Sequence, residues 1–353
     1  MSSFHIQTRP MIQRLLLYTL YVFMAILAAI FPACSTADQR FRTDDWSYAA
    51  EDLLFNGMTQ RLQIKIENSL DIPLGRDVVL KMVKVEHGTF QMGPAGYYRH
   101  DVTISQDYWI GCHPITQLQY KTVVDAINGQ GNKWLDKKDE DLPKVKVSWK
   151  TAFDFCAKLN QHTSGKRPKG YYFSLPTEAQ WEYAATGGRH SKHYPFSGGG
   201  NPDKVAWYQE TSSDQTHPVG LLQANELGIH DMSGNVWEWC MDYFADFSSN
   251  EPVTDPEGPG TLRFSIRGRD RVNRGGCYNS LAEACGVTHR HHDDPSSEYA
   301  NVGFRVVLVF DPRTIEREES AKRMKERLDK SSTWVEEKVK EKVQDVKDYI
   351  NKQ

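Results

Sequence analysis

The sequence predicts a mixed fold in which short strands and a few helices are joined by long loops. Aromatic residues make up 11% of the 353 residues, together with 25 glycines and 16 prolines. This composition is typical of a loop-rich globule held by bulky rings, not of a helix bundle. Apolar and polar residues alternate in residues 78–92, as in strands, whereas the apolar positions of residues 150–160 recur at helical spacing.

The first half of the chain predicts four short strands. Residues 78–92 should form two strands that pair with each other around a turn at His87 and Gly88. Residues 102–104 and 108–111 have the same character.

Three helices follow from capping signals and apolar spacing. Thr116 is a plausible N-cap for a helix that begins after Pro114. Residues 150–160 should form a second helix, in which Cys156 is a buried small hydrophobic residue. Thr177 and Gln180 have the spacing of a capping box, so a third helix should begin there.

The second half of the chain contains more irregular sequence. Residues 187–220 are rich in Gly, Ser, Pro, Asn and Asp, and long loops of this kind are often held by a metal or a functional site. Residues 251–260 carry too many prolines for a sheet interior. Strands at 272–278 and 303–310 should close the domain. The second is apolar on both faces and is therefore expected to be central.

The N-terminus has the layout of a secretory signal. Arg9 and Arg14 precede an apolar run at 15–31, which ends in small residues. Three outcomes remain open: lipidation at Cys34, which we favour slightly, ordinary cleavage at 35–37, or an uncleaved anchor. All three place the main domain outside the cytoplasm and associate the protein with a membrane.

These features divide the chain into four parts. We predict a signal, lipoprotein or anchor segment at 1–37, a polar lead-in at 38–76, a main domain at 77–311 and an amphipathic helical tail at 312–353. In the tail, Thr333 begins a second capping box, and apolar residues recur at spacings of seven, four, seven and four: Leu328, Val335, Val339, Val346 and Ile350.

A stripe this narrow is typical of a coiled coil or of a helix that lies on a partner. We therefore predict a helical partner or self-association through 333–350, and a helix docked on its own domain is the alternative. The formal net charge of −3 and the absence of a basic stripe before the tail argue against a nucleic-acid partner. No cysteine pair has C-x-x-C spacing, so the sequence does not indicate a zinc or thioredoxin site.

The most informative stretch is 228–242, in which a turn at 233–235 precedes two tryptophans on either side of Glu238. Gly234 tolerates the left-handed backbone that turns carbonyl groups inward. Asp231 and Glu238 bring two carboxylates to the same loop, and Ca²⁺ prefers oxygen ligands of this kind. A tight turn whose acids bond to the backbone is the alternative.

This stretch resembles the signature of the formylglycine-generating enzyme, or sulfatase-modifying factor, family. Motifs at 175–185, 274–278 and 301–305 match the same family in the same order. The resemblance implies an α+β, C-type-lectin-like fold with small antiparallel sheets.

The resemblance also implies one of the family's two calcium sites. The first would be lost, because Val205 and Gly220 stand where side-chain oxygens are needed. The second carries over to two side chains and two carbonyl groups: Asp231, Glu238, Gly234 and Val236.

Family members that make formylglycine use two cysteines five residues apart, which bind copper. Here Ser280 occupies the first position and Cys285 the second, while Cys277 stands where the family has a serine. A hydroxyl cannot replace a thiolate as a ligand of Cu(I), so we expect no copper site unless Cys277 and Cys285 converge. A disulfide or two inert buried thiols are the plainer alternatives.

A histidine-rich stretch could also suggest a metal site: His289, His291, His292, Asp293 and Asp294. We interpret it as a solvated loop, because adjacent histidines point in different directions.

Two functions therefore remain. The first is a module that binds a peptide or protein ligand outside the cytoplasm. The second is an oxidoreductase that acts on a peptide or a peptide-derived substrate. In the second case the pocket would be lined by five residues: Trp237, Ser280, Cys277, Cys285 and Arg290.

Overall fold

The computed structural model describes residues 68–320, except for 76, 95–98, 130–134, 248 and 259–269, together with 322–324, 337 and 340. These residues all belong to the unit Gln63–Gln353. The predicted signal segment at 1–37 and nearly all of the predicted apolar stripe at 328–350 lie outside the described residues. These two predictions are therefore untested. Within the described residues, no helix is both long enough and apolar enough to cross a membrane.

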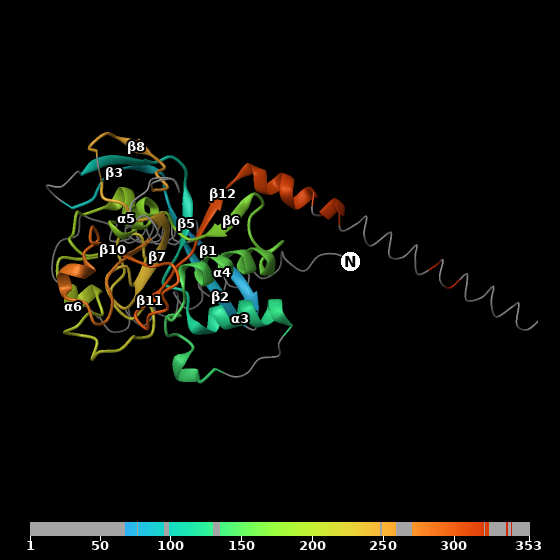
Figure 1. Cartoon of the computed structure of the whole chain (residues 1–353), viewed down its shortest axis with the longest axis horizontal. Coiled ribbons are helices and arrows are strands. Elements are labelled where there is room, and N and C mark those ends of the chain that lie inside the picture. The colour runs from blue at the N-terminus through green and yellow to red at the C-terminus, as the bar shows by residue number, and fades with distance from the viewer. Residues whose placement is uncertain are drawn as a thin grey trace, which may run out of the picture. The chain divides into compact units, whose positions relative to one another are not determined.

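The main sheet has five strands, and every neighbouring pair is antiparallel. Its order is β1 (Ser69–Gly75), β2 (Val78–Val85), β5 (Tyr108–Gly111), β12 (Val307–Phe310) and β6 (Tyr171–Ser174). The interior position of β12 confirms that the second closing strand is central, but the strand predicted at 303–310 is split, because Val302–Gly303 forms β11 in another sheet. β1 lies inside the predicted polar lead-in, so that stretch contributes an edge strand to the sheet (Figure 1).

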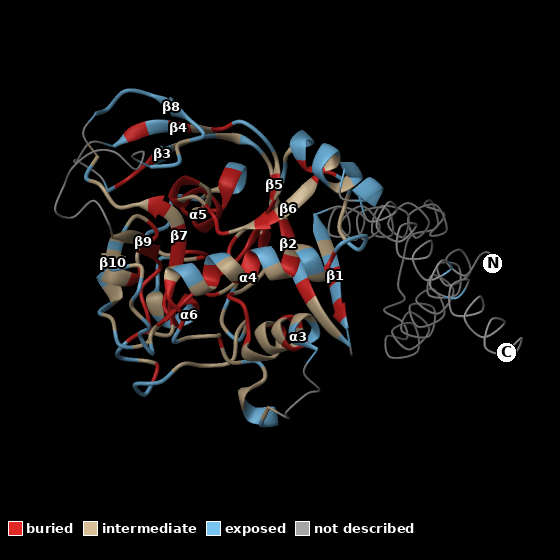
Figure 2. Ribbon diagram, turned by 45° about the vertical axis from the view of Figure 1, so that its right-hand side comes forward, coloured by how far each residue is buried: buried red, intermediate tan, exposed pale blue. Residues whose placement is uncertain are grey.

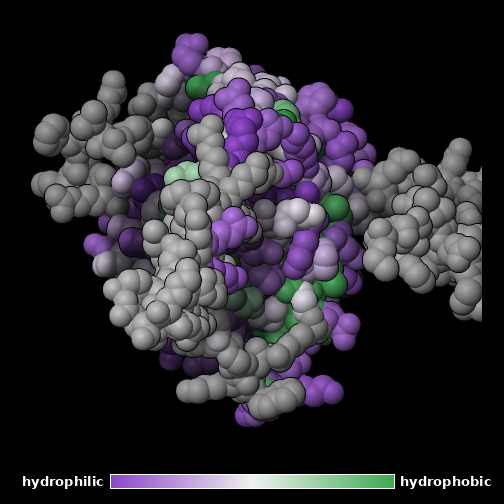
Figure 3. Space-filling view, turned by 90° about the vertical axis from the view of Figure 1, so that its right-hand side faces the viewer, coloured by the Kyte–Doolittle hydropathy of each residue, from purple (hydrophilic) through white to green (hydrophobic). Residues whose placement is uncertain are grey.

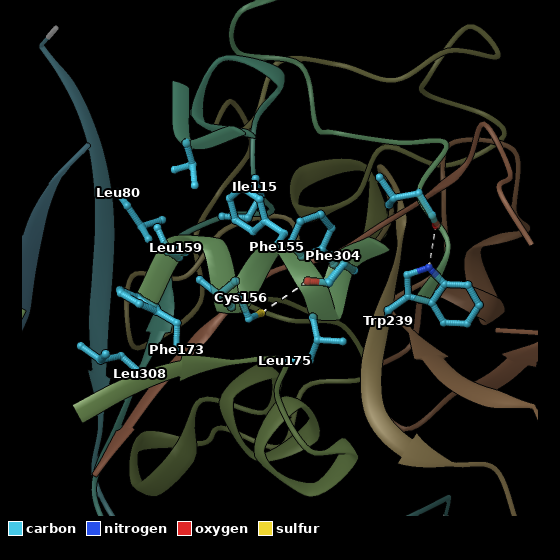
Figure 4. Packing of buried hydrophobic residues seen from close by; sticks show 14 of the residues in the cluster. Leu80, Ile115, Phe155, Cys156, Leu159, Phe173, Leu175, Trp239, Phe304 and Leu308 are labelled. Atoms are coloured by element: carbon cyan, nitrogen blue, oxygen red, sulfur yellow. Dashed lines mark hydrogen bonds between the residues drawn. The ribbon is translucent and has the colours of Figure 1, made fainter. Parts of the chain in front are cut away.

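Each face of this sheet packs against helices. On one face, Leu80 and Leu308 join Phe155 of α4 (Trp149–His162), and α3 (Gln117–Asn128) packs beside α4. Cys156 is 2% exposed and donates to the Ala152 carbonyl within this cluster, as Figure 4 shows, which confirms its predicted role.

On the other face, Val85, Ile110 and Val307 pack with α5 (Glu178–Ala185) through Trp181. Figure 2 shows α5 and the neighbouring β7 (Trp237–Tyr243) as largely buried elements. A helix buried on all sides must satisfy its polar groups internally, and this requirement shapes the site described below.

The predicted helix caps are present. Thr116 and Gln119 form a capping box at α3, and Thr177 and Gln180 form another at α5. In each box the threonine hydroxyl accepts from the N3 amide and the glutamine side chain accepts from the cap amide. Such caps contribute about 1 kcal/mol each and fix where the helices begin.

Two smaller sheets complete the domain. One has the order β10 (Arg290–Asp293), β9 (Arg271–Arg274), β7 and β11 (Val302–Gly303). The other has the order β3 (Gly88–Met92), β4 (His100–Ile104) and β8 (Val253–Thr254). In the described part of the proline-rich stretch, β8 is the only strand, and it lies at the edge of its sheet, as expected.

The structure corrects one strand pairing. The sequence predicted that the strands on either side of His87 pair with each other, but β2 pairs with β1 and β5, and β3 pairs with β4. The chain changes sheets at this turn. Short one-turn helices fill the loops: η1 (Lys137–Asp139), η2 (Gly188–His190), α6 (Pro202–Val205) and η3 (Ala282–Cys285).

Residues 312–320 are helical and dock on the domain from which they emerge. Glu318 forms an ion pair with Arg167, and Glu319 forms one with Lys169 at 3.0 Å. These contacts concern only the beginning of the tail, and the predicted apolar stripe at 328–350 is not tested. Figure 3 shows one face of the molecule, which is mostly hydrophilic with scattered apolar patches.

Candidate functional site

A fully buried ion pair organises the loop that the sequence singled out. Arg305 and Glu238 are both 0% exposed, and the guanidinium donates to the two carboxylate oxygens at 2.6 and 2.7 Å. Trp181 Nε1 also donates to Glu238 Oε2 at 2.8 Å. Arg305 further donates to three backbone carbonyl groups, those of Gly111, His230 and Asp231. The pair thus joins β7, α5 and the end of β5 at one point.

The predicted calcium ligands lie in this region, but the cation next to Glu238 is the guanidinium group of Arg305. Its carboxylate is already neutralised by the guanidinium of Arg305, which also takes the carbonyl oxygen of Asp231. Asp231 accepts from the Gly220 amide at 2.7 Å, and burial raises the pKa of its carboxyl group. Asp231 thus bonds to a backbone amide, as in the alternative of a tight turn, whereas Glu238 bonds to the side chains of Arg305 and Trp181.

The donor set Asp231, Gly234, Val236 and Glu238 therefore does not fit a Ca²⁺ ion as predicted. Among the described residues, no group of three or more His, Cys, Asp and Glu side chains is placed to hold a metal either. The calcium site stays a prediction that the geometry does not support.

Gly234 does have the conformation that the sequence indicated. Its φ is +78°, and a Cβ there would lie 2.2 Å from the Trp207 carbonyl oxygen. Asn235 also has a positive φ, and its side chain bonds to the backbone of His217 in both directions. This turn ties the long irregular loop to β7, so protein contacts hold the loop.

A second buried charge cluster lies between α5 and the four-stranded sheet. Arg290 donates to both oxygens of Glu178 at 2.6 and 2.7 Å, and Arg274 pairs with Glu178 and Glu182. Asp242 accepts from the Glu178 amide at 2.8 Å. Burial, reinforced by the nearby charge of Glu178, raises the pKa of Asp242 to about 7. Arg290 therefore bonds to Glu178 of α5. The oxidoreductase interpretation required Arg290 to lie beside the thiols, and it does not.

The thiol region is a compact polar cluster at the end of β9. Cys277 is 1% exposed, and its sulfur lies 3.0 Å from both Ser280 Oγ and Asn279 Oδ1. The Cys277 amide donates to Ser280 Oγ at 3.1 Å, and Asn301 Nδ2 donates to the Cys277 sulfur at 3.4 Å. The structure therefore places Cys277 against the serine that stands in the family's cysteine position. We call Cys277, Asn279, Ser280 and Asn301 the thiol cluster.

Cys285 lies close to the thiol cluster. Its side chain bonds to the backbone of Cys277, and its sulfur would be 2.5 Å from a Cβ at Gly276. Both cysteines are free. Burial raises the pKa of Cys277, and it raises the pKa of Cys285 to about 12, with the nearby Cys277 as a smaller cause. Both groups are therefore neutral thiols at physiological pH, which makes them poor nucleophiles.

Trp237 borders the thiol cluster through Asn301. Its backbone amide donates to the Asn301 carbonyl at 2.9 Å, and its ring lies 4.9 Å from that of His291. The Trp237 residue is 7% exposed, whereas the His291 side chain is 46% exposed. The nearly buried Trp237 ring therefore lies beside a partly exposed histidine, and the thiol cluster itself reaches the surface at Asn279, which is exposed.

The histidine-rich stretch is a strand, which corrects the predicted loop. β10 pairs with β9, so His291 and His292 face opposite sides. His291 contacts Trp237, whereas His292 Nδ1 contacts Asp270 Oδ2 at 2.7 Å and its ring lies tilted against Phe244 at 4.1 Å. The pairing of β10 with β9 was not predicted, because the two strands are separated by an intervening loop.

Sequence reasoning missed Arg305 and Asn301, although both lie in the motif 301–305. Neither position has a local partner, since Arg305 meets Glu238 across 67 residues and Asn301 meets Cys277 across 24. An unpaired arginine next to an apolar strand was the signal that could have identified the buried pair.

The comparisons with known proteins agree with this geometry. A profile of the sulfatase-modifying factor enzyme 1-like domain matches residues 74–309. The chain belongs to this family. The predicted resemblance and the α+β fold of the formylglycine-generating-enzyme type are thereby confirmed.

Two curated relatives illustrate the range of the family. Chaperone protein LppX of Paenibacillus barcinonensis is 30% identical over 64% of this chain and 88% of its own length. The formylglycine-generating enzyme of Streptomyces coelicolor is 36% identical over 46% of this chain, and the match spans 51% of that enzyme's length. Among solved structures, Treponema denticola variable protein 1 has a TM-score of 0.58 at 26% identity, covering 68% of this chain and 98% of that one.

Proposed function

We propose that this protein is an extracytoplasmic sulfatase-modifying-factor-like module that binds a peptide or protein ligand, and that it is not a copper-dependent formylglycine oxidase. One observation carries the proposal. The position of the first copper-binding cysteine in the family is Ser280, whose hydroxyl is bonded to the amide of Cys277.

The chemistry of the thiol cluster supports this interpretation. Cu(I) is a soft ion that requires thiolate ligands, and a serine hydroxyl does not supply one. The remaining thiols of Cys277 and Cys285 are buried with raised pKa values, and Cys277 already has three polar neighbours. These contacts favour a packing role for the cysteines.

Binding of a polypeptide is supported by the surface next to the cluster. His291 is partly exposed beside Trp237, an arrangement suited to contact with a ligand because an aromatic ring gives large contact area at low entropic cost. The names of two relatives, a chaperone protein and a variable protein, point in the same direction. The location outside the cytoplasm rests on the secretory signal in the sequence.

An oxidoreductase that modifies a peptide or peptide-derived substrate is the second candidate. The observation that favours it is the bond from the Cys285 side chain to the backbone of Cys277, which brings the two cysteines together despite their separation in sequence. If both thiols lost their protons, they would provide the two soft ligands that Ser280 cannot.

Oxygen uptake separates the two candidates. The purified protein is mixed with Cu(I) and a cysteine-containing peptide, beside its Cys277→Ser and Cys285→Ser variants. The binding proposal expects the same background uptake from all three proteins. Uptake by the wild-type protein that both variants lose would establish the oxidoreductase.

Ligand binding is tested by site-specific photo-crosslinking. A benzoylphenylalanine replaces His291, and a control replaces Lys150, whose side chain is 75% exposed on α4. We expect discrete polypeptide adducts, saturable by excess unlabelled protein, from position 291 and not from position 150. Equal labelling at both positions would contradict a ligand-binding surface beside Trp237.

A further inference from the structure

The buried charge cluster between α5 and the four-stranded sheet holds more acids than bases. Its members in the described part of the chain are three carboxyl groups and two guanidinium groups: Glu178, Glu182, Asp242, Arg274 and Arg290. Four of them are at most 3% exposed, and the side chain of Arg290 is 13% exposed. With all five groups ionised, the cluster would carry one uncompensated negative charge in a dry environment, which is costly.

Asp242 is the acid without a basic partner. Arg290 donates to both oxygens of Glu178, and Arg274 forms ion pairs with Glu178 and Glu182. Among the described residues, no Lys, Arg or His side chain forms an ion pair with Asp242, which accepts from the Glu178 amide instead. Burial and the nearby charge of Glu178 raise the pKa of Asp242 to about 7. The charges of the cluster therefore balance when Asp242 holds a proton.

The groups of β7 and β9 near Asp242 do not change this balance. Glu238 is neutralised by Arg305, and Cys240 is a neutral thiol whose pKa is raised by burial. Arg271 lies three residues before the arginine of the cluster in β9, so it projects from the other face of the sheet, where two aromatic rings enclose it. Its charge reaches Asp242 across the sheet and forms no ion pair with it.

β10 and the loop before residue 259 complete the surroundings of Asp242. His292 projects from the same face of β10 as Arg290, and its Nδ1 lies 2.7 Å from Asp270 Oδ2. Gly258 packs directly on Asp242, because a Cβ at Gly258 would lie 2.9 Å from Asp242 Cβ and 3.2 Å from its Oδ1. The side chain of Asp242 thus has little room to turn away when its charge changes.

Arg290 is the basic group of the cluster that can respond to Asp242. The charges of the two side chains interact, and each favours the ionised form of the other. Nε and Nη2 of Arg290 are bonded to Glu178, whereas Nη1 donates to the Ala245 carbonyl at 2.9 Å. An ionised Asp242 would be a stronger acceptor for Nη1 than this neutral carbonyl group.

A movement of Arg290 reaches the surface beside Trp237. Arg290 is the first residue of β10, and its neighbours His289 and His291 have ring centroids 5.9 and 4.9 Å from that of Trp237. Arg274 also donates to the His289 carbonyl. Both arginines of the cluster therefore hold the beginning of the strand that carries these histidines.

We propose that the cluster is a pH switch, in which loss of one proton from Asp242 to water draws Arg290 towards Asp242 and shifts the start of β10 beside Trp237. At acid pH Asp242 is neutral and Arg290 is bonded to Glu178, as in this structure. At alkaline pH the carboxylates of Asp242 and Glu178 compete for the same guanidinium. The switch regulates the surface that we propose as the ligand site, and it rests on the proposed function only for that role.

NMR spectra of the full chain follow both ends of the switch. Labelling of aspartate with 13C reports the carboxyl carbon of Asp242, and labelling of tryptophan with 15N reports the indole of Trp237. Comparison with Asp242→Asn and Trp237→Phe assigns the two signals. We expect both signals to shift with the same midpoint, at a pH of about 7. His289 and His291 titrate separately at lower pH, because burial lowers their pKa values from the ordinary value of 6.5.

Asp242→Asn has the shape and the charge of the protonated side chain, so this variant should fold and stay in the acid form. The step of the Trp237 signal near pH 7 should therefore disappear in it. A Trp237 signal that lacks this step in the wild-type protein, or keeps it in the variant, would overturn the coupling. An Asp242 midpoint near the ordinary value of 3.8 would overturn the switch altogether.

A matched pair of variants tests the balance of charges. Glu178→Gln frees Arg290 for Asp242, so the midpoint of Asp242 should fall by about 1 pH unit, a roughly 10-fold loss of proton affinity. Asp154→Asn removes an exposed charge on α4 and should leave this midpoint unchanged. An unchanged or higher midpoint in Glu178→Gln would overturn the role of Arg290, and the wild-type titration decides the rest if this variant does not fold. These spectra contain no ligand, so the switch and the proposed function can fail separately.

Discussion

Replacement of Glu238 by glutamine is expected to lower the free energy of unfolding by about 3 kcal/mol. The change keeps the shape of the side chain and removes the charge that balances the buried guanidinium of Arg305. Breaking a buried ion pair in this way costs roughly 3–5 kcal/mol, because one charge stays in a dry environment without its partner. We expect the lower end of this range, since Arg305 keeps its bonds to the carbonyl groups of Gly111, His230 and Asp231.

Urea denaturation followed by tryptophan fluorescence measures this cost. Asp154→Asn is the control, because it breaks the exposed ion pair between Lys150 and Asp154, which should contribute less than about 0.5 kcal/mol. The double variant Glu238→Gln with Arg305→Met should be more stable than the sum of the two single losses predicts, since neither charge then remains unpaired. A Glu238→Gln loss no larger than that of the control, or strictly additive losses, would refute the account of the buried pair.

Three further predictions follow from the same geometry. The pKa of Asp242 is raised from 3.8 to about 7 in the folded protein. The stability that the protonated carboxyl group contributes is therefore complete at acid pH and is lost as pH rises through 7, by up to about 4 kcal/mol. The melting temperature of Asp242→Asn should depend less on pH between 5 and 8 than that of the wild-type protein, and an equal pH dependence would contradict this. Gly276→Ala should destabilise more than Gly220→Ala in urea, because both have positive φ but only the first Cβ meets the Cys285 sulfur, at 2.5 Å; equal losses would contradict that close contact. A chelator such as EDTA should leave the melting temperature unchanged, because Arg305 supplies the cation at the predicted calcium site; a lower melting temperature restored by added Ca²⁺ would reinstate the ion.

Local signals in the sequence predicted local structure well. The capping boxes at Thr116 and Thr177 are formed by residues three positions apart, so the sequence alone specifies both partners. In both boxes the atoms that interact are neighbours along the chain. The left-handed backbone at Gly234 and the burial of Cys156 were also predicted, from residue type and from helical spacing.

Contacts between distant residues could not be predicted in this way. The turn at His87 predicted a hairpin, but β2 pairs with β5, whose register depends on strands far along the chain. The same reason explains the assignment of Glu238 to calcium, because its actual partner, Arg305, lies 67 residues later. A carboxylate in a turn indicates a cation, and the sequence does not say whether that cation is a metal or a side chain.

The family motifs identified the thiol region but not its internal geometry. The substitution at Ser280 was visible in the sequence, whereas the contact of its hydroxyl with the sulfur of Cys277 required the structure. The resemblance assigns Cys277 and Ser280 to the family's serine and cysteine positions, and the structure brings these two side chains into contact.

Copper binding by an exchange variant tests the central claim most directly. The double substitution Cys277→Ser with Ser280→Cys restores the order of residues found in copper-binding members of the family and leaves Cys285 in place. In anaerobic competition with a chromophoric Cu(I) chelator, we expect the variant to take up one equivalent of copper and the wild-type protein none. Equal uptake by the two proteins, lost on Cys285→Ser substitution, would contradict the claim that this chain has given up the copper chemistry of its family.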